Sequence, residues 1–237
     1  MATFPSSTTA DGIWTLKKQK RAQQGGDWPF VPVPLGDNAV AFDGDDYLKT
    51  AASSDFAFAN GDFTIECWIY PTTVSGIQGV LSTRVDSGAS SGQLFFGLNG
   101  SSVLYYAGSV IQGGTLTAGE WHHIACTRSS STIKIFLNGT QVATGTDIGS
   151  KTTTFGYISA GGGDGSQLFT GSVSNARFIT GYPLYTSNFT VPTSNLTALS
   201  GTILLTCQQD HLFTDNSGTS KTININGDPT ASALTPF

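Results

Sequence analysis

Residues 121–145, WHHIACTRSSSTIKIFLNGTQVATG, constrain the fold more than any other part of this sequence. Apolar and polar or small residues alternate over 124–127 and again over 133–137, which is the period of a half-buried β-strand. Asn138-Gly139 then marks a tight hairpin, because a type I′ turn requires positive φ at both central positions. A third strand begins at Val142. The stretch therefore predicts three consecutive antiparallel strands.

The same stretch contains two adjacent histidines, His122 and His123. Neighbouring residues of a regular strand point to opposite faces of the sheet, so the two side chains are not expected to share one metal ion. We expect one imidazole to pack inward and the other to face outward. A metal role for either histidine would need carboxylates from elsewhere in the chain.

The composition extends the β-strand pattern to the whole chain. Of 237 residues, 29 are glycine, one is methionine and only 11% are charged. Few strong helix formers and many β-branched and small polar residues predict an all-β protein with many turns. Strand-like runs recur from Asp37 onward at the spacing of a sandwich, and the clearest is DFTIECWIYP. We assign residues 36–237 to this sandwich and residues 1–35 to a separate arm.

The arm contains one predicted short helix, TADGIWTLKKQKRAQQGG, which Thr9 or Asp11 can cap and Gly25-Gly26 ends. A helix of about a dozen residues is marginal alone in water. We therefore expect it to dock on its own domain, on a sister subunit or on another protein, followed by the proline-stiffened linker DWPFVPVP. The expected docking residues are apolar or basic: Ile13, Trp14, Leu16, Lys17, Lys18, Lys20 and Arg21.

Net charge argues against some classes of partner, and cysteine usage indicates the compartment in which the protein is made. A net charge of −5 argues against nucleic acid or an anionic membrane surface. No apolar run approaches the roughly 20 residues of a membrane helix, and the N-terminus lacks the pattern of a signal peptide. Cys67, Cys126 and Cys207 form no CxxC pair and lie in apolar strand-like runs. We expect buried free thiols in a protein made in a reducing cytoplasm.

Five segments together carry a family resemblance: AVAFDGDDYLKT, FTIECWIYPT, GVLSTR, EWHHIACTRSSSTIKIFLNGTQVATG and FTGSVSNARFITGYPLYTSNFTVP. In this order they resemble the concanavalin A-like lectin/glucanase superfamily, and within it the laminin-G-like jelly-roll branch. The resemblance covers about residues 37–226. It implies a two-sheet antiparallel jelly-roll sandwich, to which the sequence adds the short helical arm.

A second resemblance concerns the carrier of the domain. The tail LYTSNFTVPTSNLTAL, with TILLTCQ and DNSG after it, is similar to jelly-roll domains of tailed bacteriophages, often marine or cyanobacterial. The start GIWTLKKQKRAQQGGDWP is similar to segments that attach such modules to the particle. This implies a virion protein assembled in the host cytoplasm, as a head decoration or a tail fibre or adhesin component. Its expected partners are capsid or tail proteins and a host-surface glycan, and its expected state is a homo-oligomer such as a trimer.

The superfamily also contains glycoside hydrolases, which need two carboxylates about 5–10 Å apart. The glucanase branch carries them as Glu-x-Asp-x-Glu, whereas this chain has two glutamates, Glu66 and Glu120, far apart in sequence. We therefore expect no enzymatic activity. A virion structural protein is the first interpretation, a free carbohydrate-binding lectin the second, and a divergent glycosidase the third.

Two sets of residues are candidates for binding. Laminin-G-like domains often hold Ca²⁺ through aspartates and carbonyl oxygens, and Asp43, Asp45 and Asp46 cluster at a strand end. Turn capping is the competing interpretation of these aspartates, and we expect no other cofactor. A glycan site needs an aromatic platform and polar loop groups. The expected set is Tyr105, Tyr106, Asp86 and Asp164, with Trp68, Tyr70 and Tyr157 as further aromatic candidates.

Overall fold

The computed structural model describes residues 39–86, 92–208, 213–232 and 234–237. The predicted arm, residues 1–35, lies outside the described residues together with all of its expected docking residues.

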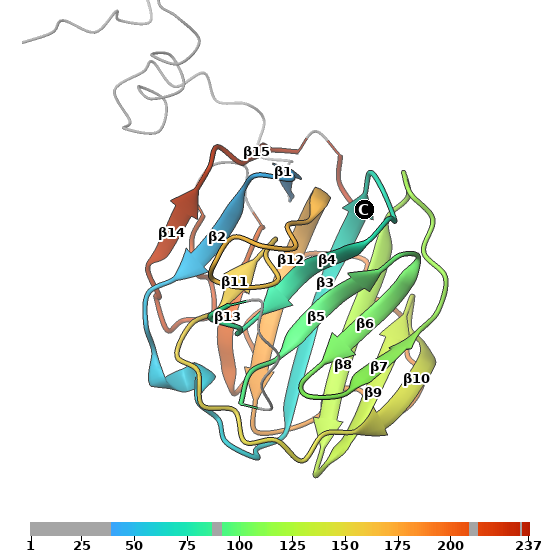
Figure 1. Cartoon of the computed structure of the whole chain (residues 1–237), viewed down its shortest axis with the longest axis vertical. Coiled ribbons are helices and arrows are strands. Elements are labelled where there is room, and N and C mark those ends of the chain that lie inside the picture. Colours follow the sequence, from blue (N-terminus) through green and yellow to red (C-terminus); the bar gives the residue numbers. More distant parts are fainter. Residues whose placement is uncertain (1–38, 87–91, 209–212, 233) are drawn as a thin grey trace, which may run out of the picture. The chain divides into compact units, whose positions relative to one another are not determined.

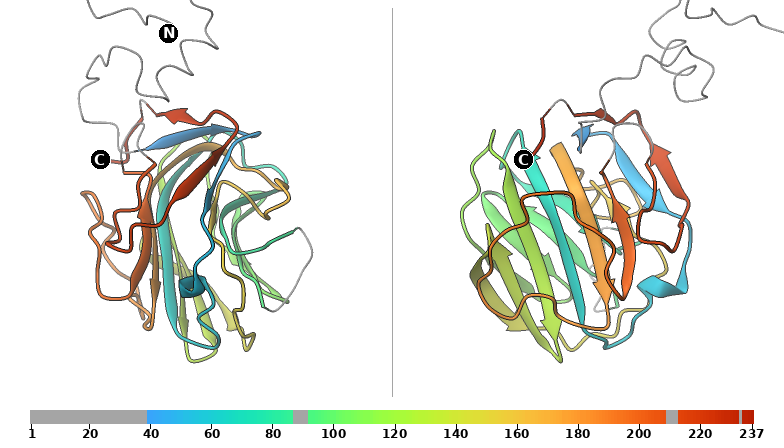
Figure 2. Two further views of the ribbon diagram at one scale, coloured as in Figure 1. Left: turned by 90° about the vertical axis from the view of Figure 1, so that its left-hand side faces the viewer. Right: turned by 180° about the vertical axis from the view of Figure 1, so that it is seen from behind.

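The described residues form two antiparallel sheets that pack face to face (Figures 1 and 2). The back sheet consists of β1 (Val40–Asp43), β3 (Phe63–Pro71), β8 (His122–Ser129), β9 (Thr132–Leu137), β10 (Thr140–Thr146), β12 (Thr170–Thr180), β13 (Thr202–Thr206) and β15 (Thr230–Ala231). Its order is β10-β9-β8-β3-β12-β1-β15, with β13 paired to β12. The front sheet consists of β2 (Tyr47–Thr50), β4 (Ile77–Ser82), β5 (Phe95–Asn99), β6 (Ser102–Tyr106), β7 (Val110–Gly113), β11 (Tyr157–Ile158) and β14 (Ile223–Asn226). Its order is β14-β2-β11-β4-β5-β6-β7. A 3-10 helix, η1 (Ser54–Phe56), lies between β2 and β3.

The all-β jelly-roll prediction is confirmed, and the three strands expected over residues 121–145 are β8, β9 and β10. Asn138 and Gly139 have φ of 50° and 78°, as the predicted turn between β9 and β10 requires. No helix in the described part of the chain has the length and apolar character needed to cross a membrane.

The core lies between the sheets and follows the alternation of each strand. In β3, Phe63, Ile65, Cys67 and Ile69 point inward and are fully buried. All three cysteines are buried and free, as the sequence predicts. Burial raises the pKa of each thiol, to about 12 for Cys207, so these cysteines behave as small apolar core residues.

Residues 181–200 contain no helix or strand and cross the outer face of the back sheet, as the right view of Figure 2 shows. We call this segment the strap. The Leu184 amide donates to Thr64 Oγ1 over 2.7 Å, and the Phe189 amide donates to the Gly139 carbonyl over 2.9 Å. The strap therefore covers part of the outer face of the back sheet.

Candidate functional site

Two neighbouring rows of side chains run across the front sheet, and the strand registers place each row on one face. The inner row belongs to the apolar core and consists of Leu48, Ile158, Leu81, Phe96, Tyr105 and Ile111. The outer row consists of Lys49, Tyr157, Ser82, Phe95, Tyr106 and Val110.

The expectation that Tyr105 contributes to a glycan site is wrong. Tyr105 belongs to the inner row, is fully buried, and its hydroxyl donates to Asp147 Oδ2 over 2.5 Å. It therefore has no surface to offer a sugar. Tyr106, the next residue, belongs to the outer row and is half-buried at the end of β6. Of the tyrosine pair, Tyr106 is the one placed to contact a ligand.

Arg84 covers the middle of the outer row. Its guanidinium lies 5.5 Å from the centre of the Phe95 ring, and Nη1 donates to Gln167 Oε1 over 3.2 Å. Only 5% of the residue is exposed. Arg84 belongs to the GVLSTR segment but was not among the predicted site residues. The signal in the sequence is a charged residue two positions after the buried strand β4.

Three of the sequence-predicted residues lie within electrostatic range of Arg84. Burial lowers the pKa of its guanidinium, whereas electrostatic interactions with Asp164, Tyr106 and Asp86 oppose that decrease. Arginine remains charged at neutral pH nonetheless. Asp86 and Asp164 are exposed, and both approach Gly162, where an added Cβ would lie 2.7 Å from Asp164 Oδ1 and from the Asp86 carbonyl carbon. The structure thus brings together one cation, two acids and one tyrosine.

The loop that carries Asp164 is held in a fixed shape. Ser159 and Gln167, at its two ends, have positive φ values of 67° and 53°. The Ser159 amide donates to the Val80 carbonyl over 2.9 Å, and the Gly79 amide donates to the Gln167 carbonyl over 2.6 Å. Strained backbone of this kind persists only where its surroundings enforce it, and it clusters at functional sites. The polar groups around Arg84 are therefore preorganised.

The other aromatic candidates divide between the two sheets. Trp68 is on the back sheet, 92% buried, with its ring centre 6.2 Å from that of Phe237. Tyr70 is also on the back sheet, 5.6 Å from Trp121 between ring centres. Tyr157 belongs to the outer row and borders the Arg84 cluster, since a Cβ added at Gly163 would lie 2.8 Å from both its Cζ atom and the Val85 carbonyl oxygen. Because only 2% of Tyr157 is exposed, it offers a ligand almost no surface.

The three aspartates predicted to bind Ca²⁺ do come together, and a fourth joins them. One carboxylate oxygen from each of Asp43, Asp45, Asp46 and Asp228 lies within 4.8 Å of the others. The hydrogen bond and the negative charge of Asp43 raise the pKa of Asp45, and burial raises that of Asp46. The sequence missed Asp228, whose amide donates to Asp46 Oδ1 over 2.6 Å. Closely packed carboxylate oxygens are ligands that Ca²⁺ prefers.

The two histidines lie on opposite faces of β8, as predicted. His122 pairs with the inward-facing Ile69. Its Nε2 atom lies 3.1 Å from the Thr117 amide nitrogen and 3.0 Å from the Thr117 carbonyl oxygen. His123 lies on the outer face, fully buried, with Nε2 3.1 Å from Glu66 Oε2. Each imidazole therefore has its Nε2 atom next to a polar group of the protein: the Thr117 backbone for His122 and the Glu66 carboxylate for His123.

Glu66 lies beneath the strap, where no substrate reaches it. It is fully buried, accepts from Arg177 Nε over 2.9 Å and from the Tyr185 hydroxyl over 2.7 Å, and contacts His123. Glu120 is exposed in the turn before β8. A glucanase-type pair of glutamates is therefore not formed. Both glutamates fall within the described residues.

A two-sheet antiparallel sandwich with polar loop groups gathered over one sheet face defines a lectin-like jelly-roll domain. The laminin-G-like family model of the concanavalin A-like lectin/glucanases superfamily matches residues 42–182, and the chain belongs to this family.

Solved structures agree on the fold. An inferred carbohydrate-binding protein from Bacteroides ovatus aligns with a TM-score of 0.58 and 16% identity over 85% of this chain; the chain spans only 62% of that protein. A heptameric SAP-like pentraxin from Limulus polyphemus aligns with a TM-score of 0.53 and 12% identity, covering 79% of this chain and 94% of the pentraxin. No curated protein matches the sequence.

Proposed function

We propose that the domain is a non-catalytic glycan-binding module whose site is the cluster of Arg84, Asp86, Asp164 and Tyr106 on the front sheet. The observation that carries the proposal is geometric: Arg84 lies over Phe95, which pairs with Tyr106, and Asp86 and Asp164 both approach Gly162 in the neighbouring loop. The exposed carboxylates of Asp86 and Asp164 can accept hydrogen bonds from sugar hydroxyls, and the half-buried Tyr106 ring can pack on the apolar face of a pyranose. The buried Arg84 guanidinium supplies positive charge beside the two carboxylates. The inferred carbohydrate-binding protein from Bacteroides ovatus has the same fold, and the ligand class inferred for it is the one that we propose here.

Binding rather than hydrolysis is the activity we propose, because Glu66 is sealed beneath the strap and Glu120 has no glutamate partner. At the proposed site the available acids are Asp86 and Asp164, and both are exposed. A glycosidase acid lies instead in buried, apolar surroundings.

Replacing Asp164 with asparagine should weaken glycan binding about tenfold or more. The change removes a charged acceptor, and hydrogen bonds to charged groups contribute about 1.5–3 kcal/mol each. A glycan array identifies a ligand for the wild-type domain, and isothermal titration then compares Asp164→Asn and Tyr106→Ala with the wild type. Glu120→Gln is the matched control, since it removes an exposed carboxylate outside the site and should leave binding unchanged.

Two results would contradict this assignment. Equal losses in Asp164→Asn and Glu120→Gln would move the site elsewhere. Release of reducing sugar that Asp164→Asn abolishes would make the site a glycosidase.

We also propose that Asp43, Asp45, Asp46 and Asp228 hold a Ca²⁺ ion, which relieves the repulsion between their carboxylates. At a hundredfold excess over the dissociation constant, Ca²⁺ should stabilise the folded domain by about 2.7 kcal/mol. Thermal unfolding in CaCl₂ and in EDTA measures this difference. Asp46→Asn should abolish it, whereas Glu120→Gln should retain it. A wild-type melting temperature that is equal in both solutions would contradict the proposal.

The setting that we propose for the module is a tailed-bacteriophage particle, displayed as a head decoration or a tail fibre component. The support is the resemblance of two parts of the sequence to phage virion proteins. One is LYTSNFTVPTSNLTAL within the strap, with TILLTCQ and DNSG after it, and the other is the N-terminal segment. The same glycan site would then face the host surface, whereas a free lectin would use it without a carrier. Electron cryomicroscopy of particles that carry the chain distinguishes the two settings.

A further inference from the structure

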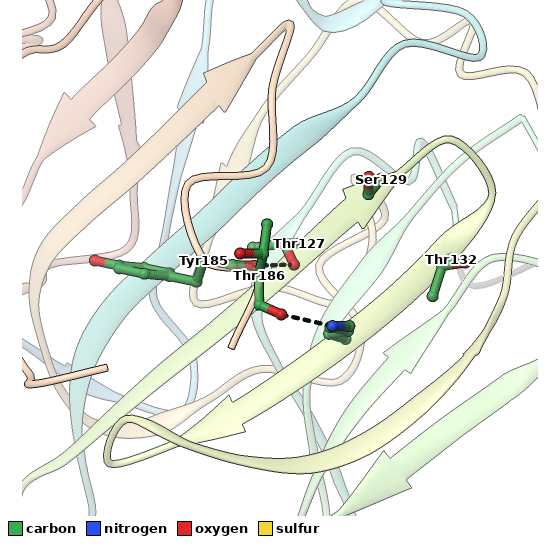
Figure 3. A pocket seen from close by; sticks show the side chains of 6 residues that line it. Thr127, Ser129, Thr132, Tyr185 and Thr186 are labelled. Carbon is green, nitrogen blue, oxygen red and sulfur yellow. Dashed lines mark hydrogen bonds between the residues drawn. The ribbon is translucent and has the colours of Figure 1, made fainter. Parts of the chain in front are cut away.

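A small cavity lies on the outer face of the back sheet, beside the strap (Figure 3). It has a volume of about 330 Å³, close to the lower limit of about 300–1,000 Å³ for small-molecule sites. We call it the strap pocket. Six residues line it: Thr127, Ser129, Thr132, Lys134, Tyr185 and Thr186. It belongs to the sheet opposite the Arg84 cluster.

The floor of the strap pocket is built by strand register. Thr127 pairs with Lys134, and Ser129 pairs with Thr132, across the ladder between β8 and β9. Directly paired residues point to the same face, so three hydroxyls and one ammonium group share the outer face of the sheet. Thr186 of the strap adds a fourth hydroxyl. This arrangement offers alternating donors and acceptors over a short distance.

The walls of the strap pocket are fixed by hydrogen bonds between strap and sheet. Thr127 Oγ1 donates to the Tyr185 carbonyl over 3.0 Å, and Lys134 Nζ donates to the Thr186 carbonyl over 2.6 Å. The Tyr185 ring is held by its hydroxyl on Glu66 and stacks on Phe189 with ring centres 3.6 Å apart. The pocket therefore exists before any ligand arrives, which lowers the entropic cost of binding.

The charge of its lining residues makes the strap pocket favour an anionic ligand group. None of its six lining residues is acidic, and Lys134 is the one cation among them. Within the described residues, the bond to Thr186 is the single hydrogen bond of the Lys134 ammonium group, and no acid forms an ion pair with it. An ammonium group has three N–H donors, so two remain for a ligand. A negatively charged ligand group could accept hydrogen bonds from these two N–H groups.

We propose that the strap pocket binds a carboxylate-bearing sugar unit, with the carboxylate on Lys134 and the ring hydroxyls on the surrounding threonines and serine. The volume of the pocket is large enough for one sugar ring. Its Thr and Ser hydroxyls can bond the hydroxyls of that ring, and the Lys134 ammonium group favours an anionic substituent. The pocket is a second site, and it does not depend on the proposed glycan site at Arg84.

The test is an NMR titration of ¹⁵N-labelled protein with three probes. Sodium glucuronate combines a sugar ring with a carboxylate, glucose has the ring alone, and sodium sulfate is an anion without a ring. Glucuronate should shift the amide signals of Ser129, Thr132 and Thr186, and it should bind at least about tenfold more tightly than either other probe. Equal binding of glucose, or equal binding of sulfate as an adventitious ion only, would overturn the proposal.

Variants then assign the effect to the pocket. Lys134→Gln should weaken glucuronate binding about tenfold or more, and Thr132→Val, at an exposed position, should weaken it by a smaller factor. Lys49→Gln, which removes a half-exposed lysine from the front sheet, is the matched control and should bind as the wild type does. Asp164→Asn should also leave glucuronate binding unchanged, which separates this proposal from the one at Arg84. Undiminished binding in Lys134→Gln would refute the assignment, and the amide spectrum of each variant reports whether it is folded.

Discussion

Replacing Arg177 with alanine should destabilise the domain by about 3–5 kcal/mol, because it leaves the buried Glu66 carboxylate without its cation. Arg177 donates to Glu66 through Nε and Nη2 and to the strap carbonyl of Thr197 through Nη1, the last over 2.7 Å. Both charged side chains are almost completely buried. One side chain therefore neutralises the acid and fastens the strap to β12. Urea unfolding followed by tryptophan fluorescence measures the loss.

Two control variants distinguish the effect of an unpaired buried charge from the effect of substitution in general. The double variant Glu66→Gln with Arg177→Met should be more stable than Arg177→Ala alone, because no uncompensated charge remains. Glu120→Gln, at an exposed position, should change the free energy of unfolding by no more than about 0.5 kcal/mol. If Arg177→Ala stayed within about 1 kcal/mol of the wild type, the strap would not depend on this ion pair.

Acid should weaken the same cluster. Burial alone would raise the pKa of Glu66, but the hydrogen bond with His123 and the charge of Arg177 outweigh burial and place the pKa below its usual value. A carboxylate with a lowered pKa in the folded state stabilises the protein above the unfolded pKa of about 4.3. That stability is lost as the pH falls through the folded pKa. The acid limb of the stability curve should therefore be flatter in the double variant.

Alternation along single strands predicted much of the fold, and register across strands decided the site. The pattern of SVLYY shows that Tyr105 and Tyr106 face opposite ways, but not which of them faces the core. That choice depends on the pairing of Tyr105 with Phe96 and Ile111, and of Phe96 with Leu81, across three ladders. The alternation within one strand therefore cannot show which of the two tyrosines faces the core.

Residues missed by sequence reasoning have partners far away in the chain. Asp228 joins an acid cluster whose other members precede it by 182 residues or more. Arg84 bonds Gln167 across 83 residues, and Glu66 meets Arg177 across 111. The sequence showed Glu66 without a second glutamate near it, and the structure places it in a buried ion pair with Arg177. Its role beneath the strap needed contacts that only the folded chain provides.

Replacing Asp147 with asparagine should cost a similar 3–5 kcal/mol, because two buried cations would then lose their shared counter-ion. Asp147 lies 2.9 Å from Lys151 Nζ and 3.3 Å from Arg128 Nη1, and both cationic side chains are almost fully buried. Asparagine keeps the shape of the side chain, so the loss reports charge rather than packing. Urea unfolding measures it, with Glu120→Gln as the exposed control.

Rescue and pH then test whether charge is the cause. Adding Lys151→Met to Asp147→Asn should recover part of the lost stability, because one of the two repelling cations is removed. Burial would raise the pKa of Asp147, but the hydrogen bonds from Tyr105 and Lys151 outweigh it and lower the pKa. The carboxylate therefore stabilises the fold above the unfolded pKa of about 3.9, and this contribution disappears as the pH falls through the folded pKa. The difference between wild type and Asp147→Asn should shrink in acid; a difference that stays constant across that range would show that shape, not charge, accounts for the effect.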